Sequence, residues 1–593
     1  MSFHPNQVQR RGRIAGWVLI GTFALLAAAF FRTQVLRHSQ YVLESEQNRL
    51  REVPLPAPRG IIYDRRGQII AENLPGYTVS LLSPSADSLR AALTRLNGTI
   101  QISADQMDVA VRRYRRAPNR PAVILADASF DVVSVLEEHR VEFPGLIIQA
   151  SPKRYYPDGP AVASFVGYTG EITESELNSK NFRGYKAGQQ VGKGGLERQY
   201  EARLRGREGT RFVEVDARGR VVREAGARQD LAPERADPLY TNIDLDLQRF
   251  VVALFGDSLR GGFVALDPTT GGVLSLYSAP TYDPNRFTGG IPADYWRQLN
   301  TDERRPLYNK VLQGRYEPGS TFKLATASLA LQAGLVTLDD HMPVPCTGGF
   351  QFGNRYFKCW EHKGHGSVSL REAIAVSCDV YFYQLGLKLG LTRIIDGGVK
   401  LRFRDKTGID LPEESSPLYP YAVDYYNKRY GPRNWSNAVI LNLAIGQGEN
   451  AQTVINMAHF YSALATDGLA STPSLAQRPT PPRDSVVKLP PETLRALREA
   501  MQGVLAAGGS AASAAIEGIR IAGKTGSAQN AQDVKNDHAW FVGMAPAEAP
   551  QIVVAIMLEF GGHGKRAARI ATKIIEHYLK AKAVPIPVTE GGG

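Results

Sequence analysis

The chain begins with one long apolar stretch and then changes to shorter alternating and helical patterns. Residues 14–31 form a run of 18 residues without a charged side chain, which is about the minimum needed to cross a ~30 Å hydrocarbon core. Three arginines within residues 10–13 precede it, and a short basic N-terminus predicts that this end lies in the cytoplasm. A cleavable signal peptide is the rival interpretation, with residues 27–29 as a candidate cleavage site. Because the run is long and a helix expected over 33–50 continues from it, we favour an uncleaved single-pass anchor.

Residues 51–235 predict small mixed α/β pieces separated by many turns. A strand–turn–strand pattern covers 59–70, and a glycine-rich turn at 192–195 opens a short helix. The same glycines suggest a phosphate-binding loop, but the Gly-Lys-Ser/Thr ending and the preceding strand are missing. That interpretation is therefore poor.

From about residue 236 the pattern becomes that of a single α+β domain. A helix is followed by a hairpin over 262–277, and an amphipathic helix over 567–581 closes the chain. Because strands are expected at both ends and helices between them, one sheet should be assembled from both ends of the domain. The late strands are expected over 519–522, 539–543 and 552–558.

Composition narrows the class of protein. The 593 residues carry a net charge of +12 and only three cysteines, and this length predicts about three or four domains. Hydrophobic content of 43% excludes a mostly disordered chain, and a mean hydropathy of −0.23 excludes a many-pass membrane protein. Three cysteines exclude a disulfide-rich scaffold. The positive charge is spread along the chain, which indicates a basic surface near anionic lipid or polymer rather than a nucleic-acid site.

The sharpest chemical signal is the segment 316–323, Tyr-Glu-Pro-Gly-Ser-Thr-Phe-Lys. Its Pro-Gly turn precedes an apolar helix expected over 324–335, so Ser320 lies at the helix N-terminus and Lys323 lies one turn later on the same face. The positive end of the helix dipole favours an oxyanion, and a desolvated lysine can take the hydroxyl proton. By itself this spacing also fits an N-cap serine followed by a solvated lysine.

Two further motifs favour the catalytic interpretation. Residues 377–379 read Ser-Cys-Asp between a helical stretch and an aromatic segment, and residues 524–526 read Lys-Thr-Gly just before Ser527. These motifs, in this order, form the active-site signature of penicillin-recognising serine enzymes. The chain therefore resembles the class B penicillin-binding proteins, and among them those of the elongation type. The resemblance also includes the N-terminal anchor and the segments 59–60, 64–67, 154–157, 167–168 and 446–449.

This resemblance implies a peptidoglycan D,D-transpeptidase. Ser320 would attack the D-Ala–D-Ala carbonyl of a donor stem peptide, release D-alanine and form an acyl-enzyme, which an amine of a neighbouring stem then resolves. Lys323 would be the general base, Ser377 would relay protons to the leaving group, and the backbone N–H groups of Ser320 and Ser527 would form the oxyanion hole. Thr525, Gly526 and Ser527 would bind the substrate. Lys524 would bind it as well and is also counted among the catalytic residues.

Asp379 departs from the general pattern, which has asparagine at this position. An ionised aspartate only accepts hydrogen bonds, so it cannot donate one to a substrate carbonyl. We expect it in the site as a counter-ion to Lys323 or to Lys524. A second Lys-Thr-Gly at 406–408 has no preceding β alternation and is expected to be a structural turn.

The resemblance also implies the fold class and the organisation of the chain. The expected fold is α+β, with one N-terminal transmembrane helix, an extended mixed α/β pedestal, and a transpeptidase domain whose antiparallel sheet is flanked by helices. We expect a cytoplasmic tail over 1–13 and a transmembrane helix over 14–32. The juxtamembrane helix and pedestal should cover 33–235, the transpeptidase domain 236–582 and a disordered tail 583–593.

The same resemblance gives a location and a set of partners. The protein is expected in the bacterial inner (cytoplasmic) membrane, with its N-terminus in the cytoplasm and its catalytic domain on the periplasmic or extracellular side. The family works with a polytopic glycan polymerase of the shape, elongation, division and sporulation type, on which the anchor and residues 51–235 would dock. Peptidoglycan stem peptides, β-lactams, scaffold proteins of the elongation complex and the membrane complete the expected partners, and nucleic acid is not among them.

Three alternatives to cross-linking during cell-wall elongation stay open. A D,D-carboxypeptidase or β-lactamase is disfavoured by the length, the anchor and the lack of a dedicated deacylating glutamate. A division-type transpeptidase is distinguished from an elongation-type one only by the overall resemblance of the chain. A penicillin-binding scaffold that activates a polymerase is disfavoured as a sole role by the intact Ser320, Lys323 and Lys524.

Catalysis by this mechanism needs no cofactor, but the cysteines suggest a structural metal. Cys346, Cys359, His365 and Cys378 fall within 33 residues, and a Cys₃His set fits a closed tetrahedral zinc site. A disulfide between Cys346 and Cys359, or three buried thiols, are the alternatives. Elongation-type relatives can carry a metal in this region. Because Cys378 lies inside the motif 377–379, zinc would brace the catalytic loop rather than do chemistry.

Overall fold

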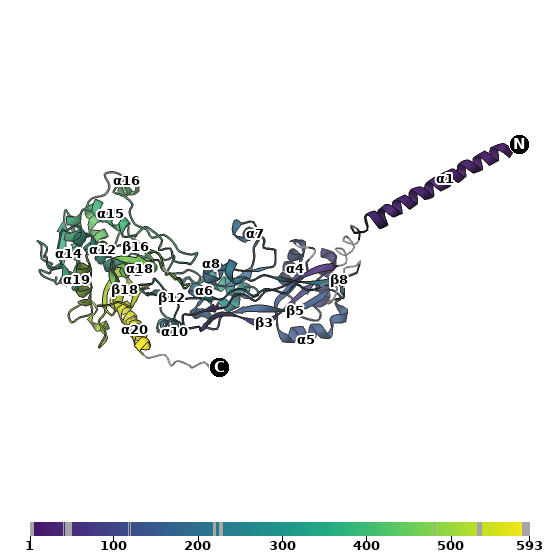
Figure 1. Ribbon diagram of the computed structural model, residues 1–593. Helices are drawn as coiled ribbons and strands as arrows, with labels where there is room; N and C mark the ends of the chain where they lie inside the picture. The colour runs from purple at the N-terminus through teal and green to yellow at the C-terminus, as the bar shows by residue number, and fades with distance from the viewer. Residues whose placement is uncertain are drawn as a thin grey trace.

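The computed structural model describes residues 5–39, 41, 50–116, 118, 120–216, 221–223, 229–479, 481–529 and 536–583. The molecule is elongated: the N-terminal helix α1 (Pro5–Phe31) projects from one end, a mixed α/β region lies in the middle, and a helix-rich domain forms the other end (Figure 1). This is the expected α+β architecture. The tail expected over 583–593 lies outside the described residues, except for residue 583 at the end of the last helix.

The helical span Gln9–Leu36 is long and apolar enough to cross a membrane, and none of its residues is buried against the rest of the protein. Its last turn, η1 (Arg32–Leu36), has π-helical hydrogen bonding. Of the helix expected over 33–50, residue 40 and residues 42–49 lie outside the described part of the chain. The span fits a single-pass membrane anchor.

A five-stranded sheet organises the pedestal after residue 50, and one short edge strand, at residues 239–240, comes from just beyond the limit expected for the pedestal at residue 235. The long strand β3 (Ile69–Leu81) is its centre, and β5 (Leu146–Tyr155) pairs with it over ten residues. The remaining strands of this sheet are β10 (Leu239–Tyr240), β2 (Ile62–Tyr63) and β4 (Ala122–Ala128). A smaller sheet joins β1 (Leu50–Leu55), β8 (Gly209–Val215) and β9 (Val221–Arg223). The helices α3 (Ala86–Leu96), α4 (Ala104–Arg116) and α5 (Phe130–Glu138) bury their apolar faces against the strands.

Four charged side chains are buried together inside the pedestal. Arg154 Nε lies 2.6 Å from Glu197 Oε1, and Arg59 also pairs with Glu197. Arg59 Nη2 lies 2.7 Å from Glu201 Oε2. Burial alone would raise the pKa of Glu197, but Arg154 and Arg59 hold that pKa below its ordinary value. The cluster joins the segment before β2 to β5 and to the short helices α8 (Gly195–Gln199) and α9 (Glu201–Leu204).

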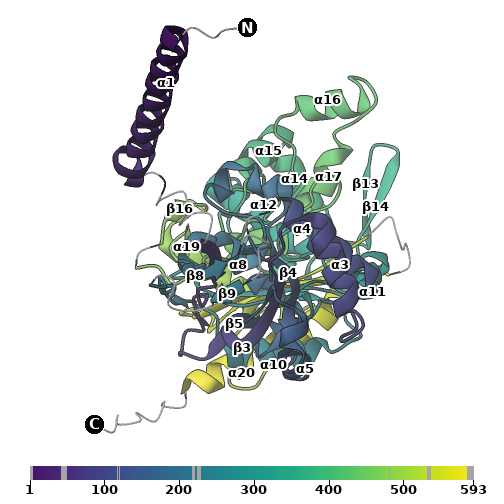
Figure 2. The same cartoon turned by 90° about the vertical axis from the view of Figure 1, so that its right-hand side faces the viewer.

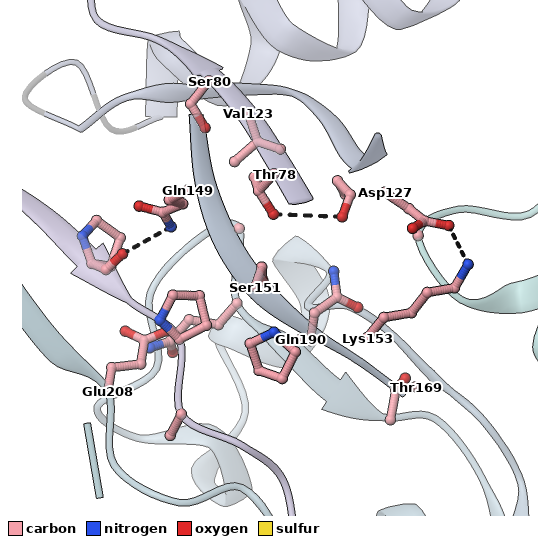
Figure 3. A pocket seen from close by; sticks show the side chains of 18 of the residues that line it. Thr78, Ser80, Val123, Asp127, Gln149, Ser151, Lys153, Thr169, Gln190 and Glu208 are labelled. Atoms are coloured by element: carbon pink, nitrogen blue, oxygen red, sulfur yellow. Dashed lines mark hydrogen bonds and ion pairs between the residues drawn. The ribbon is translucent and has the colours of Figure 1, made fainter. Parts of the chain in front are cut away.

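A cavity of about 220 Å³ lies next to these charges, and Figure 3 shows it from close by. Polar side chains of β3 and β5, among them Thr78 and Ser151, line it, and Lys153 Nζ pairs with Asp127 Oδ2 at 2.5 Å. Thr288, which follows β12 (Val273–Ala279) of the expected transpeptidase domain (236–582, below called the catalytic domain), lines it as well. The cavity therefore lies where the pedestal meets the catalytic domain.

The catalytic domain is built on one antiparallel sheet in the order β12-β11-β19-β18-β17. The first two strands form the expected hairpin, and the other three come from the C-terminal part of the chain, so the prediction of a sheet built from both ends is confirmed. Val264 and Leu266 belong to one hydrophobic core, whereas Phe263 and Ala265 belong to another. Both faces are therefore covered, by α18 (Val454–Ala465) and by α20 (Gly564–Ala583). The strands are β11 (Gly261–Leu266), β12 (Val273–Ala279), β17 (Ala522–Ala528), β18 (His538–Ala545) and β19 (Ile552–Leu558).

The limits expected for the first late strand are wrong. The alternating residues 519–522 predict a strand there, but β17 begins only at Ala522 and pairs with β18 from Ala522 opposite Met544 to Ala528 opposite His538. Ile519 instead closes a turn with Ile516. Lysine and glycine are poor strand formers, so it is the pairing with β18 that extends the strand through 524–526. The Lys-Thr-Gly motif therefore lies within an edge strand, not after it.

We expect Glu197→Gln to destabilise the protein by about 3–5 kcal/mol, because it leaves two buried arginines short of a counter-charge. The folded-state pKa of Glu197 is lowered, so its contribution is complete above the ordinary value of 4.5 and is lost as the pH falls through the lower pKa. Thermal unfolding of the detergent-solubilised protein measures this. Glu576→Gln, which removes the half-buried partner of the exposed Lys580, is the matched control and should cost less than about 1 kcal/mol. Equal unfolding temperatures for the two variants would contradict the prediction.

Candidate active site

Ser320 lies in a single 3₁₀ turn, η6 (Gly319–Phe322), that leads directly into α12 (Lys323–Gln332). The helix expected over 324–335 is thus present, but it begins one residue earlier and ends three residues sooner. Gly319 has φ +53°, and a Cβ there would lie 2.7 Å from the carbonyl oxygen of Ser527. Glycine is therefore required, because only it combines this conformation with so close an approach to β17. The turn holds the half-buried Ser320 next to the edge strand.

Lys323 is fully buried and makes three contacts with the second motif. Its Nζ donates to the Ser377 carbonyl oxygen at 2.8 Å and to Ser377 Oγ at 3.2 Å, and it lies 2.8 Å from Asp379 Oδ1. Of the two lysines considered as partners of Asp379, the ion pair thus forms with Lys323. Lys323 belongs to α12, whereas Ser377 and Asp379 belong to the second motif. They meet because the ammonium group of Lys323 has no access to water and is paired inside the protein.

The backbone at Ser377 is unusual and sets this geometry. Ser377 adopts a left-handed conformation, φ 59° and ψ 43°, where α13 (Leu370–Val376) ends and α14 (Asp379–Leu389) is about to begin. Trp360 holds the turn, donating from its backbone N to Asp379 Oδ2 and from Nε1 to the Ser377 carbonyl oxygen, both at 3.1 Å. Burial raises the pKa of Asp379, and Lys323 opposes that rise.

The third motif occupies the edge strand β17. Lys524 is fully buried, and its Nζ donates to the Thr525 carbonyl oxygen at 3.3 Å. Burial, with a further contribution from the positive charge of Lys323, lowers the pKa of Lys524 well below its ordinary value. Thr525 Oγ1 lies 3.0 Å from Ser510 Oγ, and Ser527 Oγ accepts a hydrogen bond from the Gly564 N–H at 3.1 Å. The other edge of β17 pairs with no strand among the described residues, so an extended peptide can add to it.

The second Lys-Thr-Gly, at 406–408, has a structural role that agrees with its expected interpretation. Thr407 donates from its backbone N and its Oγ1 to Glu414 Oε1, at 2.6 and 2.7 Å. Gly408 has φ +79° and donates to Glu414 Oε2 at 3.1 Å. The motif therefore closes a buried turn around Glu414 and is not part of the sheet.

The four metal-ligand candidates converge beside the catalytic loop. The ligand atoms of Cys346, Cys359, His365 and Cys378 all lie within 4.8 Å of one another, and the three cysteines are buried and free. The Sγ atoms of Cys346 and Cys359 each lie 3.6 Å from His365 Nδ1. A hairpin that stands out from the body in Figure 2, β13 (Gly349–Phe352) and β14 (Arg355–Lys358), separates the first two cysteines in sequence. Folding of this hairpin brings them together.

Two residues of the site were not found by sequence reasoning. Trp360 contacts both Ser377 and Asp379, yet it lies in a loop without a motif, so no pattern marks it. Glu317 lies inside the recognised segment 316–323, but the sequence does not show that its half-buried side chain accepts a hydrogen bond from the Gly448 N–H at 3.2 Å and lines a cleft.

Comparison with known proteins agrees with this geometry. The family profile described as the penicillin binding protein transpeptidase domain matches residues 261–576, and that of the penicillin-binding protein dimerisation domain matches residues 54–236. The chain is 32% identical to the peptidoglycan D,D-transpeptidase MrdA of Acinetobacter baumannii over 601 residues, covering 96% of this chain and 88% of the relative. It is 30% identical to the MrdA of Escherichia coli K12, covering 96% and 94%.

Solved structures give the same result. A complex between the penicillin-binding protein PBP2 and MreC from Helicobacter pylori matches with a TM-score of 0.80 and 27% identity, over 90% of this chain and all of that one. A structure titled "Structural coordination of polymerization and crosslinking by a peptidoglycan synthase complex" matches with a TM-score of 0.70 and 27% identity. It covers 98% of this chain.

The two Lys-Thr-Gly motifs form a matched pair for mutagenesis. We expect Lys524→Ala to slow acylation by fluorescent penicillin on the order of 100-fold, the scale for loss of one electrostatic contact in an active site. Lys406→Ala removes an exposed lysine from the buried turn and should leave the acylation rate unchanged. Equal effects of the two substitutions would mean that the edge-strand motif has no special role.

Proposed function

The chain belongs to the penicillin-binding protein family, and we propose that it is a peptidoglycan D,D-transpeptidase acting in cell-wall elongation. The observation that carries this proposal is the buried Lys323, one helical turn from Ser320 and in contact with both Ser377 and Asp379. A lysine that merely followed an N-cap serine would be solvated. This environment instead suits transfer of a proton from the Ser320 hydroxyl.

In the proposed first step, Ser320 Oγ attacks the D-Ala–D-Ala carbonyl of the donor peptide. Lys323 takes the hydroxyl proton and Ser377 passes it to the leaving amine of D-alanine, so that an ester to Ser320 remains. Lys323 must be neutral for this step. Asp379 Oδ1, 2.8 Å from Lys323 Nζ, would be the group that receives the proton Lys323 gives up.

The edge strand β17 would bind the donor peptide. The peptide would add to β17 as a further strand, with its terminal carboxylate held by Lys524, Thr525 and Ser527. Gly526 would support this binding by letting β17 approach the turn that carries Ser320, because a Cβ there would lie 2.7 Å from the Pro318 carbonyl oxygen. The N–H groups of Ser320 and Ser527 would stabilise the oxyanion, and the contact between Gly319 and the Ser527 carbonyl supports their proximity.

We further propose the domain limits, the membrane orientation and the partners. The anchor would be residues 14–32, with the N-terminus in the cytoplasm and the basic residues at 10–13 held there. The pedestal (33–235) and the transpeptidase domain (236–582) would lie outside the inner membrane. Solved relatives bound to MreC and in a peptidoglycan synthase complex support a scaffold protein of the elongation complex and a polytopic glycan polymerase as partners.

A structural zinc is the proposed occupant of the cysteine cluster. With Zn–S of about 2.3 Å and Zn–N of about 2.0–2.1 Å, a tetrahedral site places nitrogen and sulfur roughly 3.6 Å apart. The observed separations from His365 Nδ1 to Cys346 and to Cys359 are both 3.6 Å, so the donor set fits zinc. The metal would brace the loop through Cys378, and the proton transfers would stay with Lys323 and Ser377.

The nucleophile is tested by labelling with fluorescent penicillin. We expect the full-length protein to become covalently labelled and Ser320→Ala to show no label, because the other hydroxyl of this turn, Thr321 Oγ1, is buried and donates to the Pro318 carbonyl oxygen at 2.7 Å. Ser436→Ala, which changes an exposed serine of the same domain, should label like the parent. Labelling of Ser320→Ala at the parental rate would overturn the assignment.

The metal is tested by elemental analysis of protein purified without added zinc. We expect about one zinc per chain, and Cys359→Ser should lose the metal, unfold at a lower temperature and acylate more slowly because the loop at Ser377 loosens. His362→Ala, next to the cluster but not part of it, serves as the control. A mapped disulfide between Cys346 and Cys359 would rule the site out.

A further inference from the structure

A cleft of about 610 Å³ lies beside the catalytic turn, and none of the donor-binding groups lines it. Glu317, three residues before Ser320, is part of its wall, and so is Gln529, two residues after Ser527. Both segments that frame the nucleophile therefore continue into the cleft. A transpeptidase needs room for two peptides, and the edge of β17 provides for only one.

We propose that this cleft binds the acceptor peptide and that Glu317 is the base that takes a proton from the acceptor amine. The proposal rests on the transpeptidase function and adds its second substrate. It assigns Glu317 to the step that follows acylation.

The surroundings of Glu317 suit a proton acceptor. Its Oε1 accepts a hydrogen bond from the Gly448 N–H at 3.2 Å, and it forms no ion pair with a lysine or arginine of the described chain. Burial raises its pKa to about 7, a shift that Gly448 opposes and the negative charge of Glu449 increases. A base whose pKa lies near the working pH can both take up a proton and release it.

These groups account for every proton that moves in the second step. The acceptor arrives as an ammonium ion, and the Glu317 carboxylate removes one proton to give the neutral amine. The amine nitrogen attacks the ester carbonyl, the C–N bond forms, and the C–O bond to Ser320 breaks. The second proton lost by nitrogen returns to Ser320 Oγ by way of Lys323, and Glu317 releases its own proton to water.

Two of the four arginines that line the cleft, Arg305 and Arg315, indicate which acceptor it takes. Arg304 pairs with Asp302 at 2.9 Å and Arg260 with Glu559 at 3.2 Å. Arg305 and Arg315 also line the cleft, and within the described part of the chain neither forms an ion pair. The exposed carboxylate of Glu303 and the imidazole of His538 also lie on the wall of the cleft, besides Glu317 and Glu559. Guanidinium groups bind carboxylates with two parallel hydrogen bonds, so the acceptor should carry a carboxylate close to its amine.

The test separates the second step from the first. Full-length protein in detergent is acylated by a synthetic ester donor, an acyl-D-alanyl-D-lactate peptide, and the acyl-enzyme is allowed to react with water or with an added amine-bearing peptide. We expect Glu317→Gln to lower the ratio of cross-linked to hydrolysed product at least 10-fold, since general base catalysis typically contributes about 10²–10⁴-fold. Acylation by fluorescent penicillin should stay within about twofold of the parent, because glutamine keeps an oxygen for the Gly448 N–H.

Controls decide between catalysis and support of the fold. Glu492→Gln removes an exposed carboxylate of the same domain outside the cleft and should leave the product ratio unchanged, whereas Glu317→Asp should recover part of it. If Glu317→Gln loses acylation and cross-linking equally, or keeps the parental ratio, Glu317 is not the base. If the parent itself is not acylated by penicillin, it is the transpeptidase function that fails.

The acceptor's carboxylate is tested with the same assay. Arg315→Gln should weaken the reaction of an acceptor that carries a free carboxylate next to its amine, and should not weaken that of the corresponding carboxamide. An equal loss for both acceptors would show that Arg315 does not bind the carboxylate.

Discussion

A lysine without access to water needs a counter-charge, and the catalytic domain is arranged to supply one. Lys323 finds it in Asp379 at 2.8 Å, and removal of either partner would leave a buried charge at a cost of about 3–5 kcal/mol. The pair therefore holds α12 against the start of α14. Ser377 enters the site because it occupies the left-handed turn that makes the approach of Asp379 geometrically feasible.

The same constraint explains why the loop around Trp360 matters. One carboxylate oxygen of Asp379 faces Lys323, and the other accepts from the Trp360 backbone N–H. Trp360 directly follows Cys359, and Cys378 lies between Ser377 and Asp379. A metal held by these cysteines would thus fix both sides of the carboxylate, which gives a structural zinc a role in the geometry of proton transfer without a role in its chemistry.

Patterns in the sequence predict which groups should form the site, but they do not show the groups that depend on tertiary contact. The order of the three motifs pointed to Ser320, Lys323 and Lys524 before any geometry was known, and the alternation of apolar residues gave four of the five strands of the central sheet. These patterns leave the partner of Asp379 open, because spacing in sequence does not say which of two lysines lies nearer. They also place β17 too early, because strand pairing with β18, and not residue preference, extends the ladder through Lys524.

The pedestal supplies a physical reason for segments that resemblance alone had marked. The segments at 59–60 and 154–157 contribute Arg59 and Arg154, which meet Glu197 in the buried cluster. Their separation in sequence conceals that they share one carboxylate. The neighbouring cavity reaches Thr288 of the catalytic domain, and Thr288 Oγ1 donates to the Arg154 carbonyl oxygen at 3.3 Å, so the buried cluster lies in direct contact with that domain.

The central sheet has a consequence for the order in which the molecule matures. The β11–β12 hairpin and Ser320 are synthesised early in the catalytic domain, but β17, the strand beside Ser320, follows β12 by roughly 240 residues. Contacts so distant in sequence form late, because the intervening chain must first be made and closed into a loop. A nascent chain therefore carries Ser320, the proposed nucleophile, long before it carries the strand beside it. On this proposal the site is complete only when translation of the domain is almost finished.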